Sequence, residues 1–111
     1  MSQSLDQKIC TACEGNEAPL KPEQIDKYLE QIPGWHNLKN KTINREFSLK
    51  DFSSALTFIN QIGEIAEKEG HHPDIFLHSY KKVLITLSTH AIDGLSENDF
   101  IIASKINKLA I

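Results

Sequence analysis

Three of the five histidines in this chain lie at the ends of predicted elements, where proton-transfer chemistry is readily arranged. His71 and His72 follow the end of a long helical pattern, and His90 lies at the end of the last predicted strand. Imidazole has an unperturbed pKa of about 6.5, so it gives and takes protons near neutrality. Because the chain leaving the helix and the end of the final strand can meet at one edge of an antiparallel sheet, these three residues are candidate acid–base groups.

The residues around the paired histidines leave other interpretations open. Glu67 precedes His71 by four residues, so the two share a face if the helix persists, and the carboxylate could then orient the imidazole. His71-His72-Pro73 also suits a polar turn that closes a helix. A metal site built from His71, His72 and His90 is a further alternative, but adjacent histidines on an extended turn point apart. No metal is therefore predicted there.

Cys10 and Cys13 are the two cysteines of the chain, and both lie near its start. One pair supplies two thiolates, whereas a structural zinc needs four ligands, and the sequence does not show that His36 or another side chain converges on them. They are interpreted as reduced cysteines on a mobile arm, with a structural metal as the alternative. His36 and His78 are interpreted as surface or capping residues.

Length and composition predict one compact domain. The chain has 111 residues, of which 40% are hydrophobic; residues 1–19 are a polar arm expected to be loose, and residues 20–111 form the domain. Twelve basic and fifteen acidic side chains give a formal net charge of −3, so no nucleic-acid partner is predicted. The polar start does not resemble a signal peptide, and no apolar run approaches the roughly 18 residues of a membrane span. A cytoplasmic protein without membrane attachment is expected.

Helical and strand patterns alternate along the domain. They predict a helix from Pro22, strands over 35–39 and 42–47, a helix over 51–68, strands over 74–79 and 83–88, and a helix from Ser96 through Ala110. Strands in hairpins with helices between them are typical of an α+β domain. We expect a four-stranded antiparallel sheet with three helices packed on one face, in the order α-β-β-α-β-β-α.

The two longer helices carry recognisable ends. Ser48 is the expected N-cap of the long helix, with Asp51 three residues on, and Gly70 its stop. Ser96 and Asp99 have the same spacing at the last helix. The apolar stripe of the long helix is expected to face inward and comprises Phe52, Ala55, Leu56, Ile59, Ile62 and Ala66.

The last predicted strand has one strongly apolar face, formed by Val83, Ile85 and Leu87. Leu84, together with Ile75 or Leu77 of the neighbouring strand, is expected on the opposite face, which no helix remains to cover. Burying such side chains is worth roughly 1.5–3 kcal/mol each, so a homo-oligomer, dimer or tetramer, is predicted.

Seven residues between positions 67 and 99 follow a distinctive spacing. In order, they are Glu67, three residues, His71-His72-Pro73, six residues, Tyr80, nine residues, His90, eight residues and Asp99. The segments Gly63-Glu64-Ile65, Leu87-Ser88-Thr89-His90 and Gly94–Phe100 around them add to the pattern. This pattern resembles the signature of the pterin-4a-carbinolamine dehydratases, and the resemblance runs from about Leu20 to the C-terminus. Cys10-x-x-Cys13 with Glu17-Ala18-Pro19 is more similar to bacterial than to animal members.

The resemblance implies a hydro-lyase that acts on a tetrahydropterin with a hydroxyl group on C4a. Loss of water gives the quinonoid dihydropterin and so recycles the pterin cofactor of aromatic amino-acid hydroxylases. The elimination needs an acid for the departing hydroxyl and a base for the N5 proton. No redox change occurs, so no cofactor is implied. Animal relatives also act as dimerisation cofactors of a homeodomain transcription factor, so a homo-oligomeric protein-interaction module is the alternative function.

The resemblance also implies roles for the site residues. His71 and His90 would flank the hydroxyl as acid and base, His72 would bind the pterin ring, and Ser88 and Thr89 would offer backbone groups to its pyrimidine part.

Three further residues would support the site. Glu67 would assist His71 or sense the N5 proton. Tyr80 would be half core and half pocket wall. Asp99 is either a site residue or the N3 carboxylate of the last helix.

Overall fold

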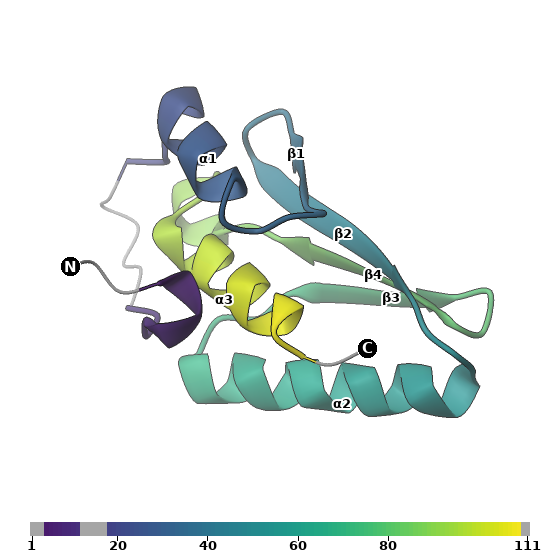
Figure 1. The fold of residues 1–111 in the computed structure, drawn as a ribbon. Helices are drawn as coiled ribbons and strands as arrows, with labels where there is room; N and C mark the ends of the chain where they lie inside the picture. Colours follow the sequence, from purple (N-terminus) through teal and green to yellow (C-terminus); the bar gives the residue numbers. More distant parts are fainter. Residues whose placement is uncertain (1–3, 12–17, 110–111) are drawn as a thin grey trace.

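The structure, a computed structural model, describes residues 4–11 and 18–109 and has the predicted α+β architecture (Figure 1). A 3-10 turn, η1 (Leu5–Gln7), precedes the domain, and a second, η2 (His90–Ile92), follows the last strand. The main elements are α1 (Pro22–Leu29), β1 (His36–Leu38), β2 (Thr42–Ser48), α2 (Phe52–Glu69), β3 (Asp74–His78), β4 (Lys82–Leu87) and α3 (Glu97–Asn107). The predicted order α-β-β-α-β-β-α is confirmed.

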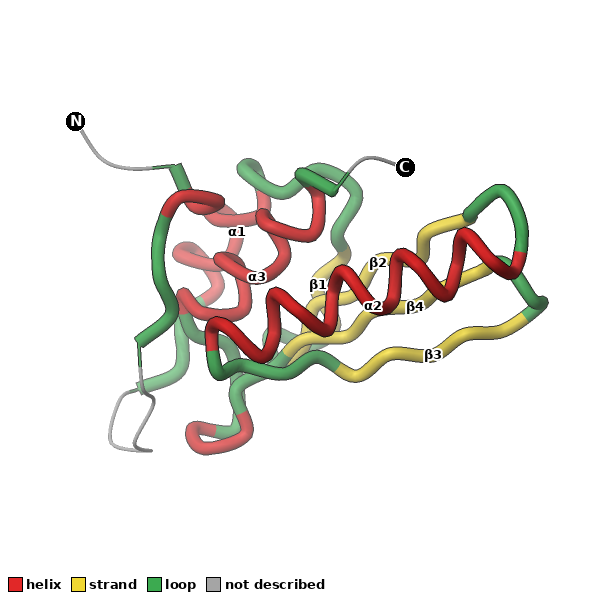
Figure 2. Tube along the Cα trace, turned by 90° about the horizontal axis from the view of Figure 1, so that it is seen from below, coloured by secondary structure: helices red, strands yellow, loops and turns green. Residues whose placement is uncertain are grey.

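The four strands form one antiparallel sheet in the order β1-β2-β4-β3, so β1 and β3 are its edges. The helices cover one face, and α2 extends along β3 and β4 (Figure 2). Val83, Ile85 and Leu87 of β4 are fully buried beneath them. No helix among the described residues is both long enough and apolar enough to cross a membrane.

The ends of the two longer helices are closed by local chemistry. Asp51 caps α2 by accepting a hydrogen bond from the Ser54 backbone N–H at 2.7 Å, so the expected Ser48 cap is wrong. Ser48 is instead the last residue of β2, where strand pairing occupies it. Gly70 ends α2 with a φ of 68°, the left-handed conformation that favours glycine.

Helix α3 begins with the predicted capping box of Ser96 and Asp99. It ends at Asn107, and Ala110, predicted to continue it, lies outside the described residues. Phe100 and Ile106 are fully buried, so α3 is the central helix of the core.

The expected inward stripe of α2 is partly wrong. Phe52 and Leu56 are 50% and 43% exposed, whereas Phe58, which the expected stripe omits, is 1% exposed. The buried face runs through Ala55, Phe58, Ile62 and Ala66, with the i, i+3, i+7 spacing of one helix side. An additional apolar strip of α2 therefore faces solvent.

The outer face of the sheet also differs from the expectation. Ile75 and Leu77 pair with Ile85 and Val83, and directly opposed residues share a face, so both point toward the helices. The outer neighbour of Leu84 is Phe76, which is 58% exposed.

The N-terminal segment is not loose where the structure describes it. Leu5 is 2% exposed and belongs to the core, and Lys105 of α3 donates a hydrogen bond to the Asp6 carbonyl at 2.8 Å. Residues 4–11 thus lie against α3, and we call them the strap. Cys13 lies outside the described residues.

Candidate active site

A pocket of about 460 Å³ lies where the end of α2, the end of β4 and the start of α3 meet. All five residues predicted to contact a substrate line it, and they are His71, His72, Ser88, Thr89 and His90. The antiparallel sheet thus brings the two histidine-bearing loops together at one edge, as expected.

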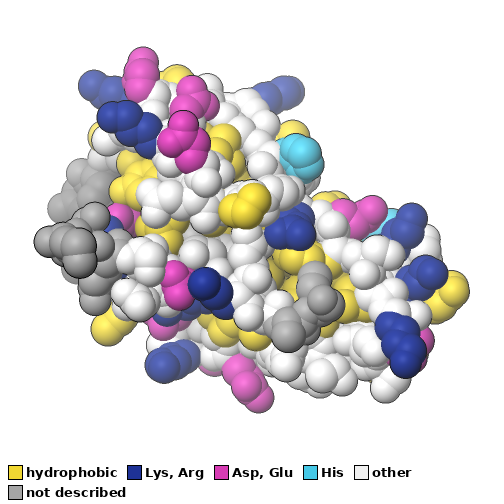
Figure 3. Space-filling model, in the orientation of Figure 1, with side chains coloured by type: hydrophobic (Ala, Val, Ile, Leu, Met, Phe, Trp, Pro, Cys, Tyr) yellow, Lys and Arg dark blue, Asp and Glu magenta, His cyan; other side chains and the backbone are white. Residues whose placement is uncertain are grey.

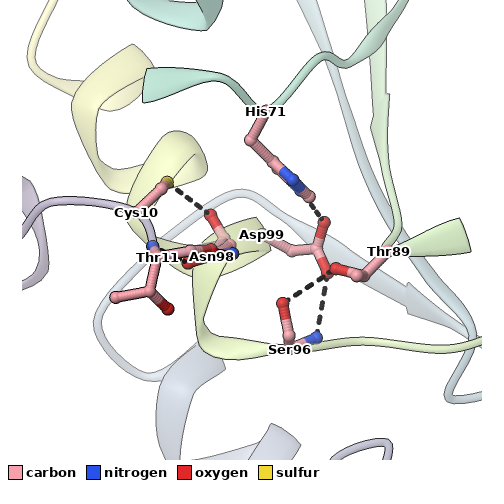
Figure 4. A network of polar contacts seen from close by, with 7 residues as sticks. All are labelled: Cys10, Thr11, His71, Thr89, Ser96, Asn98 and Asp99. Atoms are coloured by element: carbon pink, nitrogen blue, oxygen red, sulfur yellow. Dashed lines mark hydrogen bonds and ion pairs between the residues drawn. The ribbon is translucent and has the colours of Figure 1, made fainter. Parts of the chain in front are cut away.

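The pocket histidine that a buried carboxylate holds in place is His71, which follows the left-handed turn at Gly70. Its Nε2 lies 2.7 Å from Asp99 Oδ1, and the two side chains are 13% and 0% exposed (Figure 4). The other carboxylate oxygen of Asp99 accepts hydrogen bonds from the Thr89 hydroxyl at 2.7 Å and from the Ser96 backbone N–H at 3.0 Å. Asp99 is therefore both the capping residue of α3 and the partner of His71.

This network selects one tautomer of His71. An ionised carboxylate only accepts hydrogen bonds. Nε2 of His71 therefore carries the hydrogen of the imidazole and donates a hydrogen bond to Asp99. Nδ1 is then the nitrogen with a lone pair, and it has no hydrogen-bond partner among the described residues. An imidazole held in this way by a buried carboxylate is suited to act as a base.

Glu67 approaches His72 instead of His71. Its Oε1 lies 3.3 Å from His72 Nε2, and the two side chains are largely exposed. The left-handed turn at Gly70 ends the helix before His71, so the shared helical face that would join Glu67 to His71 does not form. The shared face depended on the helix continuing to His71, and this condition is not met.

His90 begins η2, directly after the buried Thr89, and its side chain is exposed at the pocket. The loop that carries it is closed by Thr89 itself, whose backbone N–H donates to the Gly94 carbonyl at 2.8 Å. The Thr89 carbonyl accepts from the Ile92 and Gly94 N–H groups. The backbone and the hydroxyl of Thr89 are thus engaged within the protein, where they support Asp99 and the loop that carries His90. The contact of Ser88 backbone groups with a pterin ring stays a prediction.

Tyr80 does not lie in the site. It occupies the turn between β3 and β4, at the end of the hairpin opposite the pocket, and is 62% exposed. Its predicted position between core and pocket wall is wrong. His36 is exposed on β1. His78 is half-buried, and its Nε2 lies 2.5 Å from Glu46 Oε1; both histidines lie at the surface, outside the pocket.

Five pocket residues are not among the predicted site residues: Thr11 of the strap, Glu69 and Gly70 at the end of α2, Ala91 of η2, and Asn98 at the start of α3. Asn98 and Glu69 adjoin predicted site residues in the chain, which is a weak signal. Nothing in the sequence points to Thr11, because its position depends on how the strap docks.

Cys10 is half-buried on the strap, and burial together with the nearby Glu69 raises the pKa of its thiol to about 12. Such a thiol stays protonated near neutrality, which makes it a poor nucleophile. Among residues 4–11 and 18–109, no group of three or more His, Cys, Asp or Glu side chains is arranged to hold a metal ion.

Fold and pocket together define a small α+β protein with a histidine-lined pocket at one edge of its sheet. The family model described as Pterin 4 alpha carbinolamine dehydratase matches residues 18–109. The chain belongs to that family.

Relatives from several organisms share most of its length. A protein of Alkaliphilus metalliredigens, provisionally named pterin-4-alpha-carbinolamine dehydratase, is 46% identical over 106 residues, 95% of each chain. A protein of Rubrobacter xylanophilus with the same provisional name is 41% identical over 105 residues, covering 95% of this chain and 97% of its own.

Solved structures show the same fold. A transcriptional coactivator/pterin dehydratase from Brucella melitensis is 37% identical with a TM-score of 0.74, over 79% of this chain and 94% of that one. A pterin dehydratase-like protein identified as a RuBisCO assembly factor in the alpha-carboxysome is 20% identical with a TM-score of 0.57, over 67% of this chain and 86% of its own. This likeness concerns the fold alone.

Proposed function

We propose that this protein dehydrates 4a-hydroxytetrahydropterin to the quinonoid dihydropterin and so returns a pterin cofactor to use. The observation that carries the proposal is the placement of His71, oriented by the buried Asp99, in the same pocket as His90. Membership of the family supports the substrate class, and the geometry of the His71–Asp99 pair supports the assignment of His71 as base and His90 as acid.

The reaction needs one proton removed and one delivered. In the proposed mechanism, Nδ1 of His71 takes the proton from N5, and the N5 electron pair forms the C4a–N5 double bond. The C4a–O bond breaks, and His90 protonates the departing hydroxyl, which leaves as water. Asp99 accepts the Nε2–H bond throughout and stabilises the imidazolium that forms on His71.

The remaining residues of the pocket would bind the ring. His72 lines the pocket beside Glu67 and is more exposed than His71, which suits a contact to the pterin and not a buried proton relay. Ser88 follows the last residue of β4 and lines the pocket, so its backbone groups could contact the pterin ring. Thr89 would act indirectly by holding Asp99.

The test is a stopped assay with chemically generated 4a-hydroxytetrahydropterin. His71→Ala and His90→Ala should each lower kcat about 10²-fold or more, above a residual rate from uncatalysed dehydration. His36→Ala, an exposed histidine on β1, is the matched control and should leave kcat unchanged. Normal kcat in both site variants would refute the mechanism, and loss of activity on chelation would favour the metal alternative.

We also propose that the protein is a homo-oligomer. Leu84 and Phe76 lie on the sheet face that none of the described helices covers (Figure 1), and Phe52 and Leu56 of α2 are also exposed. Exposed apolar groups of this size favour association.

The same surfaces support a second candidate function, interaction with a protein partner. The Brucella melitensis relative is described as a transcriptional coactivator as well as a pterin dehydratase, and coactivation requires a partner protein. Absence of turnover together with specific binding of a partner would favour this function over the enzyme.

A further inference from the structure

The N-terminal strap, residues 4–11, is attached to both elements that supply the His71–Asp99 pair. At its end, the Cys10 backbone N–H donates to Glu69 Oε1 at 2.9 Å, two residues before His71. The next residue, Thr11, donates its N–H to Asn98 Oδ1 at 3.0 Å and accepts from Asn98 Nδ2 at 2.6 Å, one residue before Asp99. Figure 4 shows Cys10, Thr11 and Asn98 on one side of Asp99, with His71 and Thr89 on the others.

Buried groups of the domain depend on these contacts. Asn98 is 6% exposed, and its side-chain amide directs both its carbonyl oxygen and its nitrogen to the Thr11 backbone. The Glu69 side chain is 4% exposed, and its partners among the described residues are the Cys10 N–H and Lys105, whose Nζ lies 3.8 Å from Oε2. Without the strap, a buried amide and a buried carboxylate would lose partners beside the site, which is costly.

The strap is docked along its length by independent contacts. Leu5 is inserted in the core at one end, and Lys8 pairs with Glu97 at 2.7 Å in the middle. Ile9, in contrast, is 76% exposed, although it lies between these anchors and the pocket. Figure 3 shows the face of the molecule seen in Figure 1, on which charged and apolar side chains are interspersed.

We propose that the strap is a positioning element of the active site: it fixes Glu69 and Asn98, and through them the distance and tautomer of the His71–Asp99 pair. Asn98 is the positioning residue that connects strap and site, and Thr11 forms one wall of the pocket. Sequence reasoning assigns this segment no function. The inference rests on the proposed function for its kinetic consequence but not for its structural one.

The experiment uses Asn98→Ala in the full chain, with Asn107→Ala as the matched control. Asn107 is also an amide of α3 with tertiary hydrogen bonds, which it accepts from Trp35 at 2.8 Å and from Arg45 at 2.9 Å, away from the pocket. Both variants should lose stability. Only Asn98→Ala should lower kcat, by about 10-fold or more, because small displacements of catalytic groups lower the rate strongly. KM should change less than about 3-fold.

A second readout is independent of catalysis. Long-range nitrogen–proton NMR spectra should show His71 as a single Nε2–H tautomer in the wild type and in Asn107→Ala, and as a mixture in Asn98→Ala. If the wild type lacks dehydratase activity, the proposed function fails while the tautomer measurement still tests the strap. An active Asn98→Ala protein with wild-type kcat and a single tautomer would overturn the inference.

Because Asn98 lines the pocket, its replacement could lower activity directly, so a second variant is placed at the far end of the strap. Leu5→Ala weakens docking without changing any pocket residue, and Ile9→Ala is its exposed control on the same segment. Leu5→Ala should reproduce the tautomer mixture and the fall in kcat in part, and Ile9→Ala should show neither. Equal behaviour of the two variants would contradict the proposal.

Discussion

Replacement of Asp99 by asparagine isolates the role of its charge, because the two side chains have nearly the same shape. Asp99 is fully buried and accepts three hydrogen bonds, from His71, Thr89 and Ser96. The Ser96 donor is a backbone N–H and cannot reverse, so the asparagine must turn its carbonyl oxygen toward Ser96 and Thr89. Its NH2 group then faces His71.

An NH2 group facing His71 forces the ring into the other tautomer. Nε2 must now accept, so the proton moves to Nδ1, the nitrogen that takes the substrate proton in the proposed mechanism. The expected loss in kcat is therefore about 10²–10⁴-fold, with KM within about 3-fold. Exchanging charge-assisted for neutral hydrogen bonds should cost about 1–2 kcal/mol of folding free energy, or about 4–8 °C in Tm.

The assay compares Asp99→Asn with Asp51→Asn, which also changes a helix-capping aspartate. Asparagine is as good an N-cap as aspartate, and Asp51 is exposed at the start of α2, far along the helix from the site. This control should keep both kcat and Tm. An Asp99→Asn protein that is folded, has shifted in Tm and still turns over at the wild-type rate would refute the tautomer argument.

Four other predictions concern separate parts of the molecule. His72→Ala should raise KM more than it lowers kcat; a fall in kcat alone would make His72 a catalytic residue. Leu84→Asp should shift the oligomer toward monomer in sedimentation while activity persists, and a wild type that is monomeric at micromolar concentration would contradict this. Hydrogen bonds from Lys8, and secondarily from Tyr28, lower the pKa of Glu97 against the opposing effect of burial. This stabilisation is present above the ordinary pKa of 4.5 and is lost as pH falls through the lower folded value. Lys8→Met should therefore unfold earlier in denaturant than the wild type at neutral pH, and this difference should shrink as the pH is lowered below 4.5. The Cys10 thiol, whose pKa is raised to about 12, should react slowly with iodoacetamide at about pH 8 in the folded protein and rapidly after unfolding.

Local patterns in the sequence determine most of the fold. Hydrophobic periodicity of 3.6 or 2 residues reports directly which segments are helices and strands, and the Ser96–Asp99 spacing and Gly70 report where helices begin and end. The capping signals are local because the hydrogen bonds of the caps join residues only three positions apart. The spacing of the three histidines likewise indicates a common edge of the sheet, and the structure places them in one pocket.

Predictions of the helix cap and of the buried helix face failed where the same sequence pattern allows more than one local structure. Both Ser48 and Asp51 can cap a helix, and the pairing of β2 with β4 decides between them by using Ser48 in the strand. Phe52, Leu56 and Phe58 are all apolar residues of one helix, and only the position of the sheet selects Phe58 for burial.

The partners of the site residues were decided by tertiary structure alone. The contact between His71 and Asp99 joins residues 28 positions apart and exists because α3 packs against the end of α2. Glu67 is closer to His71 in the chain, but the left-handed turn at Gly70 directs it to His72. The strap gave no periodic signal, since one leucine in a polar segment finds its place only on a surface that the rest of the chain has already formed. Sequence therefore determines which groups are available for proton transfer, and packing determines which nitrogen of which histidine is free to perform it.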